Sequence, residues 1–161
     1  MEITKGVYAA RMSSSHVVST SRVIPVAPSV IFDLLADPAK HPLIDGSGHV
    51  QASRGPSQRL ALGSTFSMDM REGLPYFTKN RVVEFEEDRR IAWHHFAQFI
   101  WRYELEPVDG GTKVTETFDY SVPWGVTIIP LGYPERNRTA MEKTLERIAE
   151  VVAAPPTPGD G

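Results

Sequence analysis

The stretch from Phe99 to Tyr120 reads FIWRYELEPVDGGTKVTETFDY. Apolar and polar side chains alternate through both halves of it, for example around Trp101 and Phe118. A period of two is the pattern of a β-strand with one face on an apolar core. The segment between the halves, Asp109–Gly111, contains residues typical of tight turns. The stretch therefore predicts an antiparallel hairpin.

The same alternation continues upstream of the hairpin. It indicates strands within Phe66–Met70, Tyr76–Glu86 and Ile91–His95, and β-branched residues indicate another over His16–Ile24. The links between successive strands, such as Glu87–Arg89, are too short for parallel neighbours, which need a crossover of about a dozen residues. We therefore predict a curved antiparallel sheet of about seven strands.

Helices flank this sheet in the sequence. One apolar face at helical spacing indicates a helix from Pro28 to about Asp37, and Ala39–Asp45 adds a short second helix or a turn. A longer apolar stripe, with charged residues opposite it, indicates a helix from about Pro134 to Ala153. That helix is the only predicted element long enough to cover the sheet. The expected fold class is α+β, with the sheet wrapped around the C-terminal helix.

The composition narrows the class of protein. A chain of 161 residues suits one domain, expected over residues 16–153 between a flexible tail at 1–15 and a disordered tail at 154–161. Its 17 Lys+Arg against 20 Asp+Glu give a net charge of -3, so we expect no nucleic-acid partner. The absence of cysteine excludes disulfides and thiolate catalysis. Without an apolar leader or a run of about 20 apolar residues, we expect a cytoplasmic protein with no stable membrane insertion.

Three segments carry a resemblance to a known family. Residues 26–38 (VAPSVIFDLLADP) resemble its opening segment, residues 82–93 (VVEFEEDRRIAW) its paired middle strands, and residues 103–117 (YELEPVDGGTKVTET) its last hairpin. The chain from about residue 16 to 153 thus resembles the START and birch-pollen-allergen superfamily, and more closely its bacterial polyketide cyclase/dehydrase and lipid-transport branch (SRPBCC). The resemblance implies the helix-grip fold, with a cavity between sheet and long helix that holds a hydrophobic small molecule.

The alternation assigns one set of side chains to the inner face of the sheet, and the helical stripe adds two more. Aromatic and methionine side chains dominate this set, and they suit an adaptable apolar pocket. A core filled by the same side chains is the alternative, and one β-bulge would move residues to the opposite face. The side chains expected to contact a ligand are Phe66, Met68, Met70, Trp93, Trp101, Tyr103, Phe118 and Tyr120 from the strands, with Met141 and Leu145 from the helix.

Two titratable residues are candidates for acid–base catalysis. Glu116 shares the alternation of Phe118, so an inward carboxylate would be desolvated and its pKa raised. Pairing with an Arg or Lys at the rim of the sheet is the alternative. His95 faces the same way as Trp93, whereas its neighbour His94 faces solvent. The alternative for His95 is a structural histidine, hydrogen-bonded at the edge of the core.

Motifs of several enzyme classes are absent. The sequence contains no GxxxxGK[ST], no GxGxxG after a strand, no HExxH and no GxSxG. An NTPase, a Rossmann dehydrogenase, a zincin and an α/β hydrolase therefore lack their required parts. His41 and His49 have no carboxylate at metal-ligand spacing, so we expect no metal, and we expect no cofactor.

Two arginines are further candidates for polar contacts with a ligand. Arg138 precedes Met141 by three residues and could border the buried stripe of the long helix. There it would meet a carboxylate or phosphate of the ligand, or it would pair with Glu142 one turn later. Arg81 either joins the inner face of the sheet or lies on a solvent-facing pleat.

The segment Ser121–Pro134 is unusually apolar for a connection between elements. It joins the last strand to the long helix, near the mouth of the implied cavity. One hypothesis is a lid, with Trp124 and Tyr133 touching the ligand or guarding its entry. A static plug on the core and a dimer contact are the alternatives.

Two functions from different classes fit these features. The first is binding or transport of a lipid, polyketide or aromatic metabolite, which needs only an apolar cavity with a few polar anchors. The second is a polyketide aromatase/cyclase or dehydratase, in which acid–base groups act on a chain held folded in the same cavity. A protein-interaction module is a third. We prefer binding, in a monomer or homodimer.

Overall fold

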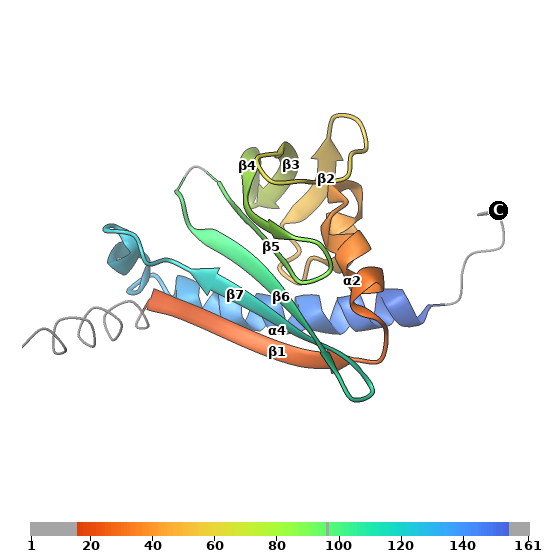
Figure 1. The fold of residues 1–161 in the computed structure, drawn as a ribbon. Helices are drawn as coiled ribbons and strands as arrows, with labels where there is room; N and C mark the ends of the chain where they lie inside the picture. Colours follow the sequence, from red (N-terminus) through yellow and green to blue (C-terminus); the bar gives the residue numbers. More distant parts are fainter. Residues whose placement is uncertain (1–15, 96, 155–161) are drawn as a thin grey trace, which may run out of the picture.

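The computed structural model describes residues 16–95 and 97–154. Within these residues, seven strands form one antiparallel sheet, and helix α4 runs along one face of it (Figure 1). This arrangement confirms the expected α+β helix-grip fold. The tail expected at residues 1–15 lies outside the described residues, as does the one expected at 154–161 apart from Ala154.

The strand order in the sheet is β1-β7-β6-β5-β4-β3-β2, so the first strand of the chain pairs with the last. The edge strand β2 escapes the sequence analysis because Val50 is its only strongly apolar residue. The strands are β1 (Val17–Ile24), β2 (Val50–Arg54), β3 (Thr65–Glu72), β4 (Leu74–Glu86), β5 (Arg90–His94), β6 (Ile100–Val108) and β7 (Gly111–Asp119).

A residue with a restricted or unusual backbone conformation marks the start of each of the two longer helices, α2 and α4. Pro28 opens α2 after an extended Ala27, and the carboxylate of Asp37 accepts a hydrogen bond from the Ala39 amide (3.1 Å) in the turn that follows. Gly132 precedes α4 with a φ of 74°, a left-handed conformation that favours glycine. The helical segments are α2 (Pro28–Leu35), the 3₁₀ turn η2 (Pro38–Lys40), α3 (His41–Ile44), the 3₁₀ turn η3 (Gly125–Ile128) and α4 (Tyr133–Ala153).

Strand β4 contains an irregularity that keeps its apolar side chains on the core. Its register against β5 shifts between Val82 and Glu84. Val82 pairs with Trp93 and Phe85 pairs with Ile91, so Val82 and Phe85 both contact the core although they lie three residues apart. An uninterrupted strand would place them on opposite faces.

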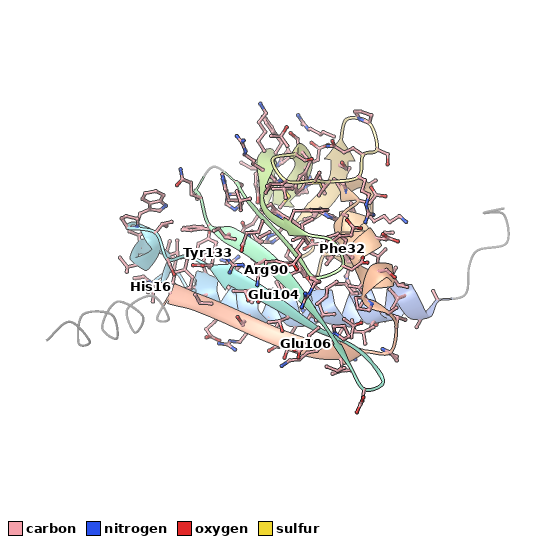
Figure 2. The ribbon with its side chains drawn as sticks, in the orientation of Figure 1. His16, Phe32, Arg90, Glu104, Glu106 and Tyr133 are labelled. Carbon is pink, nitrogen blue, oxygen red and sulfur yellow. The ribbon has the colours of Figure 1, made fainter. Side chains whose placement is uncertain are left out.

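This irregularity also decides the position of Arg81. Val82 is buried, so Arg81 is exposed on the other face of the sheet, where it pairs in register with His94. Of the two positions open to it, the solvent-facing one is correct. The same outer face carries Arg90 and Glu104, whose side chains form an ion pair at 3.1 Å across β5 and β6 (Figure 2).

Helix α4 packs mainly against β1 and β7, and against α2 and α3. The buried side chains form two separate clusters. The larger one joins α2 to the C-terminal half of α4 through Leu145 and Ile148, and the smaller one surrounds Met141 nearer the start of α4. The helix therefore contacts the sheet chiefly along the β1–β7 edge.

Gly46 sets the distance between α4 and the connection that follows α3. A Cβ at this position would lie 2.3 Å from the carbonyl oxygen of Ala140 and 2.4 Å from the amide nitrogen of Thr144. The Gly46 amide also donates a hydrogen bond to the Thr144 hydroxyl (3.0 Å). The two atoms nearest that Cβ belong to the backbone of α4 and cannot move without displacing the helix.

We predict that Gly46→Ala destabilises the protein by about 3 kcal/mol or more, because backbone atoms of α4 occupy the space of the new methyl group. Thermal denaturation measures the loss. Gly48→Ala is the matched control, because Gly48 has a φ of 75° but open space around it and should lose only about 1–2 kcal/mol through backbone strain. Equal losses in the two variants would contradict the close packing.

Candidate functional site

A cavity of about 900 Å³ lies between the inner face of the sheet and α4. Strands β2 to β7, the α3 region, η3 and the first half of α4 all contribute to its wall. The larger apolar side chains of its lining are Ile44, Val50, Phe66, Met68, Met70, Trp93, Phe99, Trp101, Phe118, Ile128, Leu131 and Met141.

Stacked rings make one part of this wall rigid. The Trp93 ring stacks on His41 with centroids 5.0 Å apart and an interplanar angle of 20°. Phe66 meets both of these rings edge-on at 5.5 Å. The His41 Nε2 atom lies 2.9 Å from the Leu35 carbonyl oxygen, which fixes the orientation of the imidazole. Burial lowers the pKa of His41, so it is neutral at pH 7.

A second aromatic group lies toward the other end of the sheet. Phe118 on β7 packs against Trp101 at 4.6 Å and against Phe99 at 5.6 Å. Phe99 in turn meets the His95 ring edge-on at 6.4 Å. Aromatic faces therefore line the cavity along much of the length of β5, β6 and β7.

Glu116 and Tyr103 form the most deeply buried polar pair of this wall. They are register partners on β7 and β6, with exposed fractions of 3% and 6%. The Tyr103 hydroxyl donates a hydrogen bond to Glu116 Oε1 at 2.8 Å. Glu116 Oε2 is the one buried side-chain oxygen or nitrogen among the described residues that has no hydrogen-bond partner.

Burial dominates the protonation of this pair. It raises the pKa of Glu116 to about 8, opposed by the Tyr103 hydrogen bond and reinforced by the negative charge of Asp45. Burial also raises the pKa of Tyr103 well above its ordinary value, with the Glu116 charge adding to the effect. At pH 7 the pair therefore consists of a neutral carboxylic acid and a neutral phenol.

The second catalytic candidate, His95, stands apart from Glu116. It lines the cavity, and burial together with the neighbouring His94 lowers its pKa. His94, the residue before His95, pairs with Ile100 on β6. Glu116 pairs with Tyr103 on β6 and itself lies on β7, two strands away from β5. The two backbone positions are therefore about 13 Å apart along the strands and about 10 Å apart across them. The sheet does not bring the two residues together as a pair of acid and base.

The cavity reaches solvent beside the first turns of α4. Glu72 at the end of β3 and Arg136 on α4 form an ion pair at 2.7 Å, and the Arg136 guanidinium lies 5.0 Å from the centre of the Tyr133 ring. Tyr133 lies at the same end of the molecule as His16 (Figure 2). The Glu72 and Arg136 side chains are 38% and 53% exposed, and both line the cavity, as does Leu131. An exposed pair of this kind can open at little cost.

Four of the residues expected at the ligand do not line the cavity. Leu145 is buried in the larger apolar cluster, and Tyr120 is buried beside Phe118 at the beginning of β1. Trp124 is 44% exposed, and its indole nitrogen donates to the Ala97 carbonyl oxygen at 3.0 Å. Arg138 has a 44% exposed side chain, and its Nε atom lies 3.8 Å from a carboxylate oxygen of Glu135.

The other predicted residues do border the cavity. They are Phe66, Met68, Met70, Trp93, His95, Trp101, Tyr103, Glu116, Phe118, Tyr133 and Met141. Most of them lie on strands, where the period-two alternation correctly selects the side chains on the inner face of β3, β5, β6 and β7.

Sequence reasoning missed several polar residues of the wall. Thr78 and Asn80 of β4 are buried there, and they follow the same alternation as Val82, which was the available signal. Arg136 replaces Arg138 as the arginine at the cavity, because the helix turns these two positions to different sides. His41 gave no signal, since its neighbours come from distant parts of the chain.

Among residues 16–95 and 97–154, no three His, Asp or Glu side chains are grouped so that they could hold a metal ion. Within the same residues, no helix combines the length and apolar character needed to cross a bilayer.

We predict that Glu116→Gln changes how stability depends on pH. The Glu116 pKa is about 8 in the folded protein and near 4.5 in the unfolded chain, so the unfolded chain alone loses this proton between those values. The free energy of unfolding therefore falls as the pH rises from 4.5 to about 8, by at most about 5 kcal/mol. The variant has no such proton and should have a higher Tm than the natural protein at pH 8, converging near pH 4.5.

Thermal denaturation across this pH range makes the comparison. Glu106→Gln, on the exposed part of β6 (Figure 2), controls for the removal of one carboxyl group. A difference between the natural protein and Glu116→Gln that does not grow with pH would contradict a neutral buried carboxyl.

Comparisons with known proteins agree with this architecture. A solution structure of the KanY protein superimposes with a TM-score of 0.68 at 14% identity, covering 86% of this chain and 97% of that one. A protein from Rhodobacter sphaeroides gives a TM-score of 0.68 at 18% identity, covering 86% and 92%. Identities this low show a shared fold only.

Two curated relatives are closer in sequence. The uncharacterised proteins Rv0088 and MT0096, from two strains of Mycobacterium tuberculosis, are each 32% identical over 143 residues. The alignment covers 84% of this chain, and the chain spans 64% of the length of these relatives. A family model described as polyketide cyclase / dehydrase and lipid transport matches residues 15–153. The chain therefore belongs to the polyketide cyclase/dehydrase and lipid-transport family.

Proposed function

We propose that this protein binds one hydrophobic small molecule, such as a lipid, polyketide or aromatic metabolite, in the cavity between sheet and α4. The observation that carries the proposal is the cavity itself, about 900 Å³ with a wall of aromatic and methionine side chains. Ligand pockets of proteins span about 300–1,000 Å³, are mostly apolar and contain few polar groups. Membership of a family described by lipid transport supports the same function.

A polyketide cyclase or dehydratase is the second candidate. The family description includes these enzymes, and Glu116 with a pKa near 8 is poised to exchange a proton near neutral pH. Binding takes precedence because His95 lies far from Glu116 along the sheet. One carboxylic acid hydrogen-bonded to Tyr103 suits a ligand anchor better than it suits a chain of proton-transfer groups.

The three tryptophans of the chain offer a direct test of where a ligand binds. Trp93 and Trp101 line the cavity, whereas Trp124 does not. Bromine quenches indole fluorescence only at short range, so methyl 9,10-dibromostearate reports its own position. We predict saturable quenching of Trp93 and Trp101 by this ester, with Trp124→Phe leaving the quenching intact.

The matched variant is Trp93→Phe/Trp101→Phe, which keeps Trp124 as its only indole. Its fluorescence should be quenched less than that of Trp124→Phe at the same concentration of the brominated ester. Quenching confined to this double variant, and lost in Trp124→Phe, would place the ester on the surface and overturn the proposed function.

We further propose that residues 121–134 form a lid over the cavity. Ile128, Leu131 and Tyr133 border the cavity from this segment. The Trp124 indole is held by its hydrogen bond to Ala97, and Leu131 is 63% exposed. Apolar side chains at this position would gain burial when an apolar ligand sits beneath them.

We predict that saturating methyl 9,10-dibromostearate slows amide hydrogen exchange in residues 121–134 by about tenfold, because the ligand stabilises the closed segment. The β6–β7 hairpin is the internal reference and should change little. Unchanged exchange in the segment would indicate a static plug. Slowing that follows protein concentration rather than ligand would indicate a dimer contact.

A further inference from the structure

One oxygen of the Glu116 carboxyl group is buried without a hydrogen-bond partner, and binding of a purely apolar ligand does not account for it. Glu116 borders the cavity and is 97% buried, since its exposed fraction is 3%. Its Oε2 atom has no partner, although nearly all buried polar atoms in proteins have one. Leaving such an atom unpaired destabilises the protein, and a ligand atom at hydrogen-bond distance would recover that loss.

The hydrogen bond from Tyr103 decides which oxygen carries the proton. The Tyr103 hydroxyl donates to Oε1, so Oε1 acts as an acceptor. The proton of the neutral acid then lies on Oε2, because a protonated carboxyl has one hydroxyl oxygen and one carbonyl oxygen. Oε2 therefore carries a donor hydrogen without an acceptor, on a residue that borders the cavity.

The charges around Glu116 favour this neutral form. On β6 the facing group is Tyr103, itself neutral, and Thr20 is the β1 partner of Glu116. Asp45 adds negative potential, and its carboxylate is occupied by Ser47 and by the Val50 amide.

The other elements around the cavity contribute few charges that could hold a carboxylate. Helix α4 contributes Arg136, paired with Glu72, and Lys143 to the wall. His41 and His95 border the cavity with lowered pKa values. Among the described residues, no cation forms an ion pair with Glu116.

We propose that Glu116, oriented by Tyr103, anchors the ligand by donating a hydrogen bond from Oε2 to a carbonyl oxygen of an otherwise apolar molecule. This inference rests on the proposed function, because it specifies the ligand of the same cavity. A ketone or ester oxygen is satisfied by this single donor, whereas an alcohol brings a hydrogen that needs a further acceptor. Met141 on α4 also borders the cavity, and its unbranched side chain can adapt to a bound molecule.

Three brominated probes of similar size test the proposal by tryptophan quenching. Methyl 9,10-dibromostearate carries a carbonyl group, 9,10-dibromooctadecane carries no oxygen, and 9,10-dibromooctadecylamine carries a cation. At pH 6.5 we expect the natural protein to bind the ester about tenfold more tightly than the dibromoalkane, and the amine no better than the dibromoalkane. A single hydrogen bond of this kind corresponds to about tenfold in affinity.

Two variants separate the anchor from the cavity. Tyr103→Phe/Glu116→Leu removes both polar groups together, so no partner is left unpaired, and should lose the preference for the ester while binding the dibromoalkane within about twofold of the natural protein. Glu116→Gln keeps an N–H donor in place of the protonated oxygen. It should keep the preference for the ester and hold it unchanged from pH 6.5 to 9.5, whereas the natural protein should lose it above pH 8.

The outcomes distinguish the two levels of the proposal. Failure of all three probes to quench the natural protein would overturn the proposed function. Equal binding of ester and dibromoalkane, in the natural protein and in the double variant alike, would leave the cavity function standing and overturn the anchor. Tighter binding of the amine than of the ester at pH 6.5 would also overturn it, because it would mean that Glu116 is ionised.

Discussion

One-sided contact between α4 and the sheet is the constraint on which the rest of the structure depends. The helix packs on β1 and β7 and on the short helices, while the inner faces of β3 to β6 border open space. Gly46 allows the connection after α3 to meet the backbone of α4 directly at Ala140 and Thr144, near the middle of the helix. Among the described residues, one apolar cluster packs on the C-terminal half of α4 and a second surrounds Met141, and both border the cavity.

The same arrangement explains the chemistry of the wall. A carboxyl group on the inner face of β7 has lost its water, so its pKa rises and it becomes a donor instead of an anion. Tyr103 orients it from the neighbouring strand. His95 and the Glu72–Arg136 pair lie elsewhere along the wall, so the polar groups of the site are spread along it.

Most of the strands, and many of the side chains that line the cavity from them, could be predicted from the sequence, because apolar and polar residues alternate along a regular strand. The hairpin also sets the register of β6 and β7: Val108 pairs with Gly111, and counting outward places Tyr103 opposite Glu116. The irregularity in β4 reverses the side assignment between Arg81 and Phe85 and leaves no mark in composition. The stacking of His41 on Trp93, and the choice of Arg136 over Arg138 at the mouth, depend on how distant elements pack, which local sequence does not encode.

Anomalous diffraction from crystals of the protein grown with methyl 9,10-dibromostearate tests the central claim most directly, because bromine positions locate the molecule without assumptions about its shape. The account predicts bromine peaks enclosed between the inner face of the sheet and α4, with the ester oxygen within hydrogen-bond distance of Glu116 Oε2. An interior filled by the protein's own side chains, with bromine found only on the outer surface, would contradict it.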